Sequence, residues 1–541
     1  MDWIKGKCQA YKFDKETTVF LLFLAGMAVY YGWRMFALTP WYDELYTYYY
    51  FISRGPVYAA IHWPLPNNHI GYSVLSACLG VFGNAAIALR GVSCLCSLGS
   101  LILIFRLGRK CLARGMALIP VFLYAGMGSV NQLAVQGRGY ALVTFCYLTA
   151  LWELWHMAIE GRIKAVDHIL FGLSLVMALY AIPSSLYVVI PVCLAGGAAL
   201  LLNRDGRGFV RLLVTSLISA FCTVGLYGIV WLAIGSNLLV KTEGSGFYGM
   251  GHVAVICRAP FTAVKTGIEY MLATPYIQSV GRAGYLEKFA QWLRNLLNGY
   301  YAGGALVLAA VLLIAAFLSI VGIVRRCKED IRTPKEPCSG HNGIGGTCFV
   351  EIYLTCSIIG IPLMLVVMCS LPYYRVFSFA GAVAAFAAAW LWQKLAEQMS
   401  AVTAKCGKSG AVGSAVCGAL CIFLLCTPAY RAQYSSREAA IEDAYEHVDL
   451  TRAGRIGVTD CDQEYLLLFL YGIGEERITR VPEEAEVILA DKYLLLDYDT
   501  DVIDWSGDDW KLYLSPEQFA ESGVMQKREA VYENDRFILF Q

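Results

Sequence analysis

Long apolar segments alternate with short polar connections along the first 430 residues of the chain. A helix needs about 20 apolar residues to cross the hydrocarbon core of a bilayer, and many of these segments are close to that length. We therefore predict about eleven transmembrane helices. They are expected at residues 19–35, 85–105, 116–130, 140–158, 169–182, 191–202 with the apolar residues before it, 212–234, 305–324, 349–370, 376–392 and 411–425.

The positions of the basic residues predict how these helices are oriented across the membrane, because Lys and Arg concentrate in the short cytoplasmic loops of membrane proteins. Residues 70–81 form an apolar segment that is too short to span comfortably, and we expect that it does not cross. We therefore expect a multi-pass protein of the plasma (inner) membrane, with its N-terminus cytoplasmic and the region after Pro428 extracytoplasmic. With this assignment the basic loops all fall on one side; they lie at residues 106–114, 162–164, 204–211, 325–328 and 394–408.

The composition supports lipid as the main solvent. The 541 residues are 57% hydrophobic and 16% charged, whereas soluble domains carry about 25% charged residues. The net charge of +1 conceals an asymmetry, because residues 430–541 hold 25 acidic and 11 basic side chains while the rest of the chain is basic. Such a split indicates two differently located parts. No nucleic-acid partner is expected.

These patterns predict a polytopic α-helical membrane protein with a small C-terminal extracytoplasmic α/β domain. Residues 1–429 form the expected transmembrane domain, with external loops at 38–69 and 235–300. Apolar side chains recur with helical period from Tyr285 to Leu296, which favours an amphipathic helix at the membrane surface. Residues 430–541 alternate strand-like pieces (455–459, 487–490, 511–514 and 536–540) with helical pieces (438–448, 463–471 and 516–522).

Polar residues that are unusual for a membrane protein gather at the predicted external ends of the helices. Asp43 and Glu44 directly follow the first span, where charges are costly unless they have a partner or a task. The other candidates are His62, Asn67, Asn68, His69, Gln136, Arg138, Tyr140, Tyr180, Ser184, Tyr373, Tyr374 and Arg375.

The chemistry follows from these residue types. A carboxylate accepts a proton from an attacking hydroxyl when it lies within hydrogen-bond reach. An Arg binds a phosphate through its planar fork and stabilises the charge that develops as the phosphate leaves. The sequence therefore predicts attack by a hydroxyl on a sugar that is carried by a lipid phosphate.

The order of these motifs resembles a known family. Asp43-Glu44 follows the first helix, the segment PLPNNHIGY occupies residues 64–72, Arg90 opens the next span, Gly108-Arg109 closes it, and Arg138-Gly139-Tyr140 precedes the fourth. This order is similar to that of the membrane glycosyltransferases of the GT-C fold. The likeness is strongest to the family-39 group, which includes protein mannosyltransferases and the aminoarabinose transferase of lipid A. It covers roughly the first 200 residues, with support from Tyr373-Tyr374-Arg375.

The resemblance implies a polyprenyl-phosphate-linked sugar donor, a cavity at the outer membrane face, and an acidic residue of the first external loop as catalytic base. We expect the transfer to be inverting. By position, Asp43 is the catalytic base and Glu44 supports it. Where the lipid A enzyme has a Lys-Pro-Pro motif, this chain has Leu-Pro-Asn-Asn-His, so a lipid A acceptor and an aminoarabinose donor are not implied. The candidate substrate-binding residues are His62, Asn68, His69, Arg138, Tyr140, Tyr374 and Arg375.

Three alternatives remain open. In the first, His62 and His69 bind a divalent metal ion together with the carboxylates. We expect instead that no cofactor is needed and that the histidines form hydrogen bonds with the acceptor or the loop. The second alternative is a transporter or flippase for a lipid-linked saccharide, and the third is a ligase that uses a lipid-linked oligosaccharide. The acceptor is a lipid, a glycan or a protein, and membrane lipids are the remaining expected partners.

Overall fold

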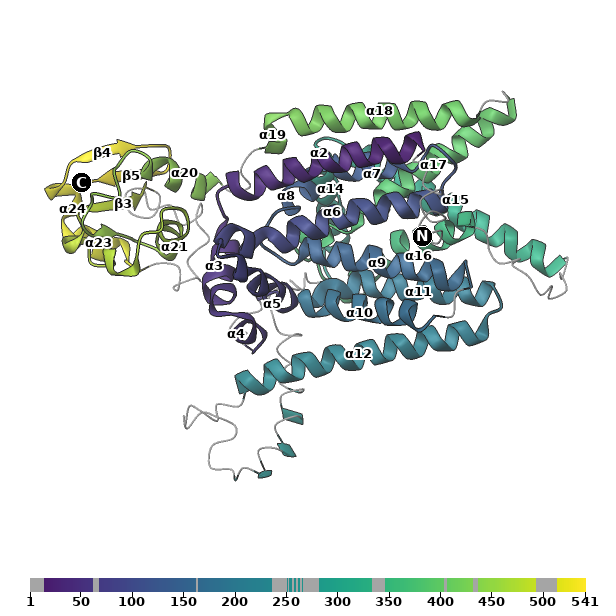
Figure 1. The fold of residues 1–541 in the computed structure, drawn as a ribbon, viewed down its shortest axis with the longest axis horizontal. Helices are drawn as coiled ribbons and strands as arrows, with labels where there is room; N and C mark the ends of the chain where they lie inside the picture. The colour runs from purple at the N-terminus through teal and green to yellow at the C-terminus, as the bar shows by residue number, and fades with distance from the viewer. Residues whose placement is uncertain are drawn as a thin grey trace, which may run out of the picture.

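A computed structural model of the protein shows long helices packed side by side, with a small mixed domain at one end of the bundle, next to helix α3 (Figure 1). The residues that it describes are 14–61, 68–161, 164–235, 251, 253–254, 257–258, 261–262, 265, 282–332, 346–402, 406–431, 436–492 and 513–541. The α-helical bundle with a C-terminal sheet that the sequence predicts is thereby confirmed.

The bundle contains long helices and several short ones that connect them. The long helices are α2 (Lys15–Ala37), α6 (Ala85–Cys111), α9 (Tyr140–Ala158), α10 (Ala165–Ala181), α11 (Leu186–Leu202), α12 (Gly206–Gly235), α14 (Tyr285–Tyr300), α15 (Ala305–Arg332), α16 (Gly346–Met368), α17 (Ala380–Val402) and α18 (Cys406–Cys426). The short helices are α3 (Tyr42–Tyr50), α4 (Pro56–Ile61), α5 (Ile70–Leu79), α7 (Leu118–Ala125), α8 (Gly128–Leu133) and α19 (Pro428–Arg431).

Seven of the helices in the described ranges are long and apolar enough to cross a membrane, as expected of a multi-pass membrane protein. They are α2, α6, α11, α12, α15, α16 and α18. The segment 70–81 forms the short helix α5, as expected from its length. The side of the membrane on which each end lies stays a prediction.

One expected span, residues 116–130, is not a single helix. It forms α7 and α8, which are separated at Met127, whose backbone is extended. Glycines at 126 and 128 flank the break, and glycine weakens a helix because it loses the most conformational freedom on folding. A run of apolar residues predicts burial, but it does not locate a break of this kind.

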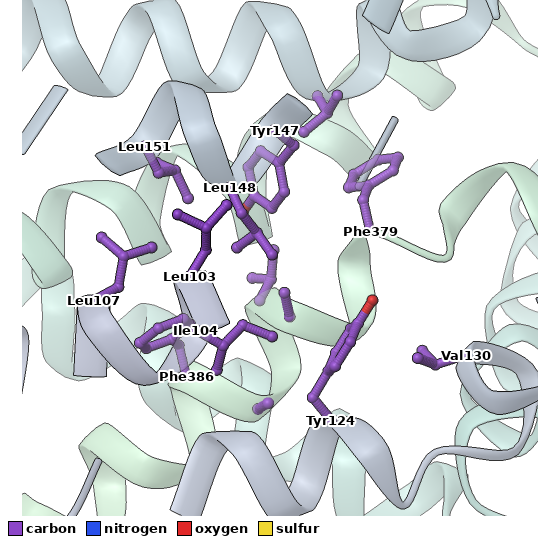
Figure 2. Close-up of a cluster of buried hydrophobic side chains, with 14 of the residues drawn as sticks. Leu103, Ile104, Leu107, Tyr124, Val130, Tyr147, Leu148, Leu151, Phe379 and Phe386 are labelled. Carbon is purple, nitrogen blue, oxygen red and sulfur yellow. The ribbon is translucent and has the colours of Figure 1, made fainter. Parts of the chain in front are cut away.

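The core lies where α6, α7, α9 and α17 meet (Figure 2). Leu103, Ile104 and Leu107 of α6 face Tyr147, Leu148 and Leu151 of α9. Phe379 and Phe386 come from the α17 side, and the ring centroids of Tyr147 and Phe379 are 5.9 Å apart with the ring planes at 66° to each other. Helix α9 is buried along almost its whole length, so it is surrounded by protein rather than by lipid. This core holds the ends of α6 and α9 in fixed positions.

The C-terminal domain contains a mixed sheet with strand order β2-β1-β3-β5-β4 in the described residues. The strands are β1 (Ile456–Gly457), β2 (Ile478–Thr479), β3 (Val487–Asp491), β4 (Ala530–Glu533) and β5 (Phe537–Phe540). Strand β1 pairs in parallel with β2 and β3, and β5 runs antiparallel to β3 and β4. The helices are α20 (Ser436–Tyr445), α21 (Cys461–Leu470), α23 (Pro516–Ser522) and α24 (Val524–Lys527).

Most of the expected pieces of this domain are found, and one is not. Of the predicted strand 511–514, Tyr513 and Leu514 form a bend, while residues 511 and 512 lie outside the described residues. Buried Arg437 stabilises the domain, because it forms ion pairs with Asp460, Asp462 and Asp491.

The domain packs directly on α3. The rings of Tyr49 and Tyr465 stack with centroids 5.1 Å apart, and Tyr48 packs edge-on against Phe469 at 5.3 Å. The backbone N–H of Tyr42 donates a hydrogen bond of 2.9 Å to Glu438 Oε1. Helix α3 is therefore held by the bundle and by the C-terminal domain together.

Replacing Tyr465 with Ala is expected to loosen this contact. An aromatic pair contributes about 0.5–1.5 kcal/mol beyond its buried area, and that contribution is lost together with the buried ring. Hydrogen exchange should then rise in α3 as well as in α21. Tyr532→Ala is the matched control, because Tyr532 stacks on His447 within the domain. An α3 whose exchange does not respond to Tyr465→Ala would show that the domain does not hold it.

Candidate active site

Glu44 lies at the start of α3, where its carboxylate is fully buried. Oε2 accepts a hydrogen bond from the backbone N–H of Trp41 at 3.0 Å, which caps the helix at its N-terminus. Arg90 donates to both carboxylate oxygens, from Nε to Oε1 at 2.8 Å and from Nη2 to Oε2 at 3.0 Å. The bidentate pair fixes the orientation of α3 on the bundle.

Arg90 also joins α3 to the end of α2. Its Nη1 donates to the carbonyl oxygens of Leu38 at 2.6 Å and Met35 at 3.0 Å. Met35 lies in the last turn of α2 and Leu38 is its C-cap residue, and a positive charge is favourable at this end of a helix. Since Arg90 is 1% exposed, it must be paired in this way to be tolerated.

Gly137 completes the surroundings of Glu44. Its backbone N–H donates to Oε1 at 2.6 Å. A Cβ at this position would lie 2.5 Å from Leu89 Cδ1 and 3.1 Å from the Glu44 carboxylate, so only glycine allows this approach. The two oxygens of Glu44 thus accept four hydrogen bonds.

Asp43 has different surroundings from its neighbour. Its Oδ2 lies 3.1 Å from Arg375 Nη1, and the two side chains are 15% and 24% exposed. Within the described residues this oxygen accepts no hydrogen bond of good geometry. The Arg375 guanidinium also lies over the rings of Trp41, at 4.8 Å, and Tyr373, at 4.9 Å. The structure therefore brings a carboxylate and an Arg from distant parts of the chain together. Both side chains are partly exposed, while Asp43 Oδ2 itself is buried.

Arg138 lies beside this pair and is 1% exposed. Its Nη1 donates to Thr47 Oγ1 at 2.6 Å and to the backbone oxygen of Asp43 at 3.4 Å. Its Nη2 lies 3.3 Å from His69 Nε2. Arg138 thus adds positive charge beneath Asp43 while it supports the first two turns of α3.

Two hydrogen-bond donor groups face the ring of His69. The backbone N–H of Gly139 lies 2.9 Å from Nδ1, and Arg138 faces Nε2. A neutral imidazole has only one acceptor nitrogen, so the ring that accepts from Gly139 at Nδ1 carries its proton on Nε2. A second proton, on Nδ1, would remove that hydrogen bond and place a positive charge beside Arg138. Burial, together with the charges of Arg138 and Arg375, lowers the pKa of His69 well below its ordinary value of 6.5.

This pKa shift gives a pH dependence of stability. Below pH 6.5 the unfolded chain binds a proton at His69 that the folded protein excludes, so the free energy of unfolding falls as the pH falls. One proton contributes at most about 1.4 kcal/mol per pH unit. Thermal unfolding between pH 7 and pH 5 should therefore show a smaller loss of Tm for His69→Gln than for the wild type. A His447→Gln control, at a site in the C-terminal domain, should follow the wild type.

The other residues that the sequence predicts for the site differ in how they are placed. Asn68 is buried, and its side chain joins neighbouring segments of the chain. Its Nδ2 donates to Ala59 O at 3.1 Å, and its Oδ1 accepts from Ser73 Oγ at 2.7 Å. Tyr140 is buried and packs edge-on against His69 at 5.1 Å. Tyr374 is 45% exposed, and its hydroxyl accepts from Asn295 Nδ2 at 3.1 Å. His62 and Asn67 lie outside the described residues.

The sequence reasoning did not assign roles to Arg90, Thr47 and Trp41. Arg90 had a detectable signal, because an Arg within an apolar span requires an anionic partner nearby. Thr47 and Trp41 had none beyond their nearness to Asp43. In the described residues no group of three or more His, Cys, Asp or Glu side chains is arranged to hold a metal ion. The divalent-metal hypothesis included His62 and stays untested.

Comparisons with known proteins add structural neighbours only. No family model matches the sequence, and no curated protein matches it. The structure is similar to ArnT from Cupriavidus metallidurans bound to undecaprenyl phosphate, with 12% identity, a TM-score of 0.48 and 97% of each chain covered. It is also similar to the oligosaccharyltransferase AglB of Archaeoglobus fulgidus in complex with an inhibitory peptide and a dolichol-phosphate. That match has 12% identity, a TM-score of 0.43, and coverage of 88% of this chain and 69% of AglB.

A second oligosaccharyltransferase structure from Archaeoglobus fulgidus, a complex with Zn and sulfate, matches with 12% identity and a TM-score of 0.49. It covers 93% of this chain and 70% of the neighbour. These structural neighbours are GT-C enzymes. At this level of identity, the roles of individual residues have to be argued from the site itself.

Proposed function

We propose that the chain is a membrane glycosyltransferase, which moves a sugar from a polyprenyl-phosphate donor to an acceptor hydroxyl. The observation that carries this proposal is the Asp43–Arg375 pair. A carboxylate with an oxygen that accepts no hydrogen bond in the described residues lies 3.1 Å from a partly exposed guanidinium. Together they supply one base and one phosphate-binding cation.

In the proposed reaction, the acceptor oxygen attacks the anomeric carbon of the sugar. The new glycosidic bond forms as the bond between that carbon and the phosphate oxygen breaks, and the electron pair leaves with the phosphate. Asp43 accepts the hydroxyl proton. Arg375 stabilises the negative charge on the leaving phosphate. Attack opposite the leaving group inverts the anomeric centre.

Asp43 suits the base role better than Glu44. A base has to reach the proton that it removes, and Glu44 is fully buried with both oxygens already occupied. Glu44 therefore acts as a positioning residue that sets the direction of α3. This agrees with the supporting role that the resemblance implies for it.

The remaining residues divide between support and substrate contact. Arg138 and His69 are buried next to Asp43. Arg138 therefore adds positive charge near the phosphate site, but its guanidinium group is not exposed for direct binding of the phosphate. Asn68 and Tyr140 support the same region from buried positions. Tyr374, which is exposed beside Arg375 in sequence, is the proposed contact for donor or acceptor, and His62 keeps its proposed place near the acceptor.

The site lies on the external face of the membrane in this proposal, with the N-terminus cytoplasmic and the C-terminal domain covering α3 from outside. The acceptor is a lipid, a glycan or a protein. The reaction as written needs no resident cofactor, because the base and the cation both come from the chain.

The test uses the full chain purified in lipid nanodiscs. Mass spectrometry of the co-purified lipid is expected to find a polyprenyl phosphate. Reconstituted vesicles are then supplied with polyprenyl-phosphate-linked sugars, and sugar transfer and sugar translocation are measured separately. Transfer without translocation supports the proposal. Translocation without transfer would instead identify a flippase, and transfer only from long lipid-linked oligosaccharides would identify a ligase.

A further inference from the structure

A second polar site lies at the opposite end of α9 from Tyr140. It is an open cavity of about 380 Å³, within the range of about 300–1,000 Å³ that is typical of ligand sites. Helix α9 has 19 residues, so the cavity is about 28 Å from the end that carries Asp43. The cavity is lined by Arg106, Lys110, Trp152, Glu153, His156, Glu160 and Asp167. Glu153 is buried and has a partner of its own.

Three of these side chains satisfy one another. Lys110 Nζ and His156 Nδ1 each lie 2.8 Å from an oxygen of Glu160. Burial acts to raise the pKa of Glu160, but the hydrogen bonds from Lys110 and His156 outweigh it and lower the pKa to about 2. Glu160 is therefore ionised and neutralised within the protein.

Two others have no such partner. Asp167, in the first turn of α10, is 4% exposed, and among the described residues its Oδ2 has no hydrogen-bond partner. Arg106 lies over the ring of Trp152, with the guanidinium carbon 4.6 Å from the centroid. No ion pair of Arg106 is found in the part of the chain that the structure describes. The cavity thus presents one unpaired anion and one unpaired cation.

We propose that this cavity binds the headgroup of a zwitterionic phospholipid that carries a primary amine. The ammonium group meets Asp167, and the phosphate meets Arg106. Arg106 is exposed, whereas Asp167 is buried. A simple anion would contact Arg106 but would lie beside the acidic lining, and a simple cation would contact Asp167 alone. A ligand with both charges satisfies both residues.

The position of the cavity favours a lipid over a soluble ligand. It opens at the ends of α6, α9 and α10, next to Trp152, and tryptophans are enriched at the headgroup level of membranes. This proposal does not depend on glycosyl transfer.

Native mass spectrometry of the full chain in detergent tests the proposal, with phosphatidylethanolamine and phosphatidylglycerol as probes. The wild type is expected to retain phosphatidylethanolamine, and Asp167→Asn and Arg106→Gln are each expected to weaken its binding about tenfold or more, since each removes a charged contact. Phosphatidylglycerol, which lacks the amine, should bind more weakly and should not respond to Asp167→Asn.

Arg114→Gln is the matched control, because Arg114 is exposed at the same end of the bundle and does not line the cavity. It should bind like the wild type. Thermal unfolding of each variant checks that the fold is kept. Equal retention of both lipids, or variants that bind phosphatidylethanolamine like the wild type, would overturn the site. Soluble phosphoethanolamine that binds as tightly as the lipid would overturn the lipid as its source.

Discussion

Asp43→Asn is expected to abolish sugar transfer while leaving the protein folded. The amide keeps the size of the side chain but cannot take the proton of an attacking hydroxyl. General-base catalysis contributes about 10²–10⁴-fold to a rate, so kcat should fall by at least that factor. Folding should be retained, because the Asp43–Arg375 pair is partly exposed and such pairs contribute little to stability. Initial rates with a polyprenyl-phosphate-linked sugar measure the effect.

Asp535→Asn is the control for this experiment. Asp535 is exposed in the C-terminal domain, and the substitution makes the same chemical change away from α3. It should transfer sugar at the wild-type rate. If Asp43→Asn also kept the wild-type rate, Asp43 would not be the base, and the reaction would need another proton acceptor.

Arg90→Leu is expected to have the largest effect on stability. It leaves the buried carboxylate of Glu44 without its bidentate partner and the last carbonyls of α2 without their donor. Removing one partner of a buried ion pair costs about 3–5 kcal/mol. Thermal unfolding in detergent should show a large fall in Tm, with loss of expression as a further sign.

The double variant Glu44→Met/Arg90→Leu separates the charge from the packing. With both charges removed, much of the lost stability should return, because no unpaired charge remains buried. Arg109→Leu is the comparison, since Arg109 forms partly exposed pairs with Asp14 and Glu16, and its effect should be within about 1 kcal/mol. A Tm of Arg90→Leu as high as that of Arg109→Leu would contradict the structural role of Arg90.

The helices were predictable because lipid imposes a simple rule. The segments 85–105 and 305–324 were long and apolar, and they correspond to α6 and α15. The break between α7 and α8 was not predictable, since it depends on how two glycines pack against neighbouring helices. Strands β2 and β4 were missed for a related reason. They are short, and pairing with distant strands stabilises them more than their own residues do.

In the candidate site, too, the sequence predicted the unusual residues but not the contacts that tertiary packing creates. The sequence indicated Asp43 and Arg375 as unusual charges, but it could not show that they lie 3.1 Å apart, because tertiary packing joins them. Nor could it distinguish two adjacent acids. Glu44 turns inward to Arg90 and Asp43 turns to Arg375, because successive positions of a helix point in different directions.

The contact between α3 and the C-terminal domain has a consequence for biosynthesis. A ribosome makes Tyr42–Tyr50 early, whereas Glu438 and Tyr465, which hold that helix, emerge near the end of translation. At the usual speed of synthesis the interval is tens of seconds. During this time Asp43 lacks its final support, so a nascent or truncated chain in the membrane would carry an unfinished site, and activity would begin only after the last domain has folded onto α3.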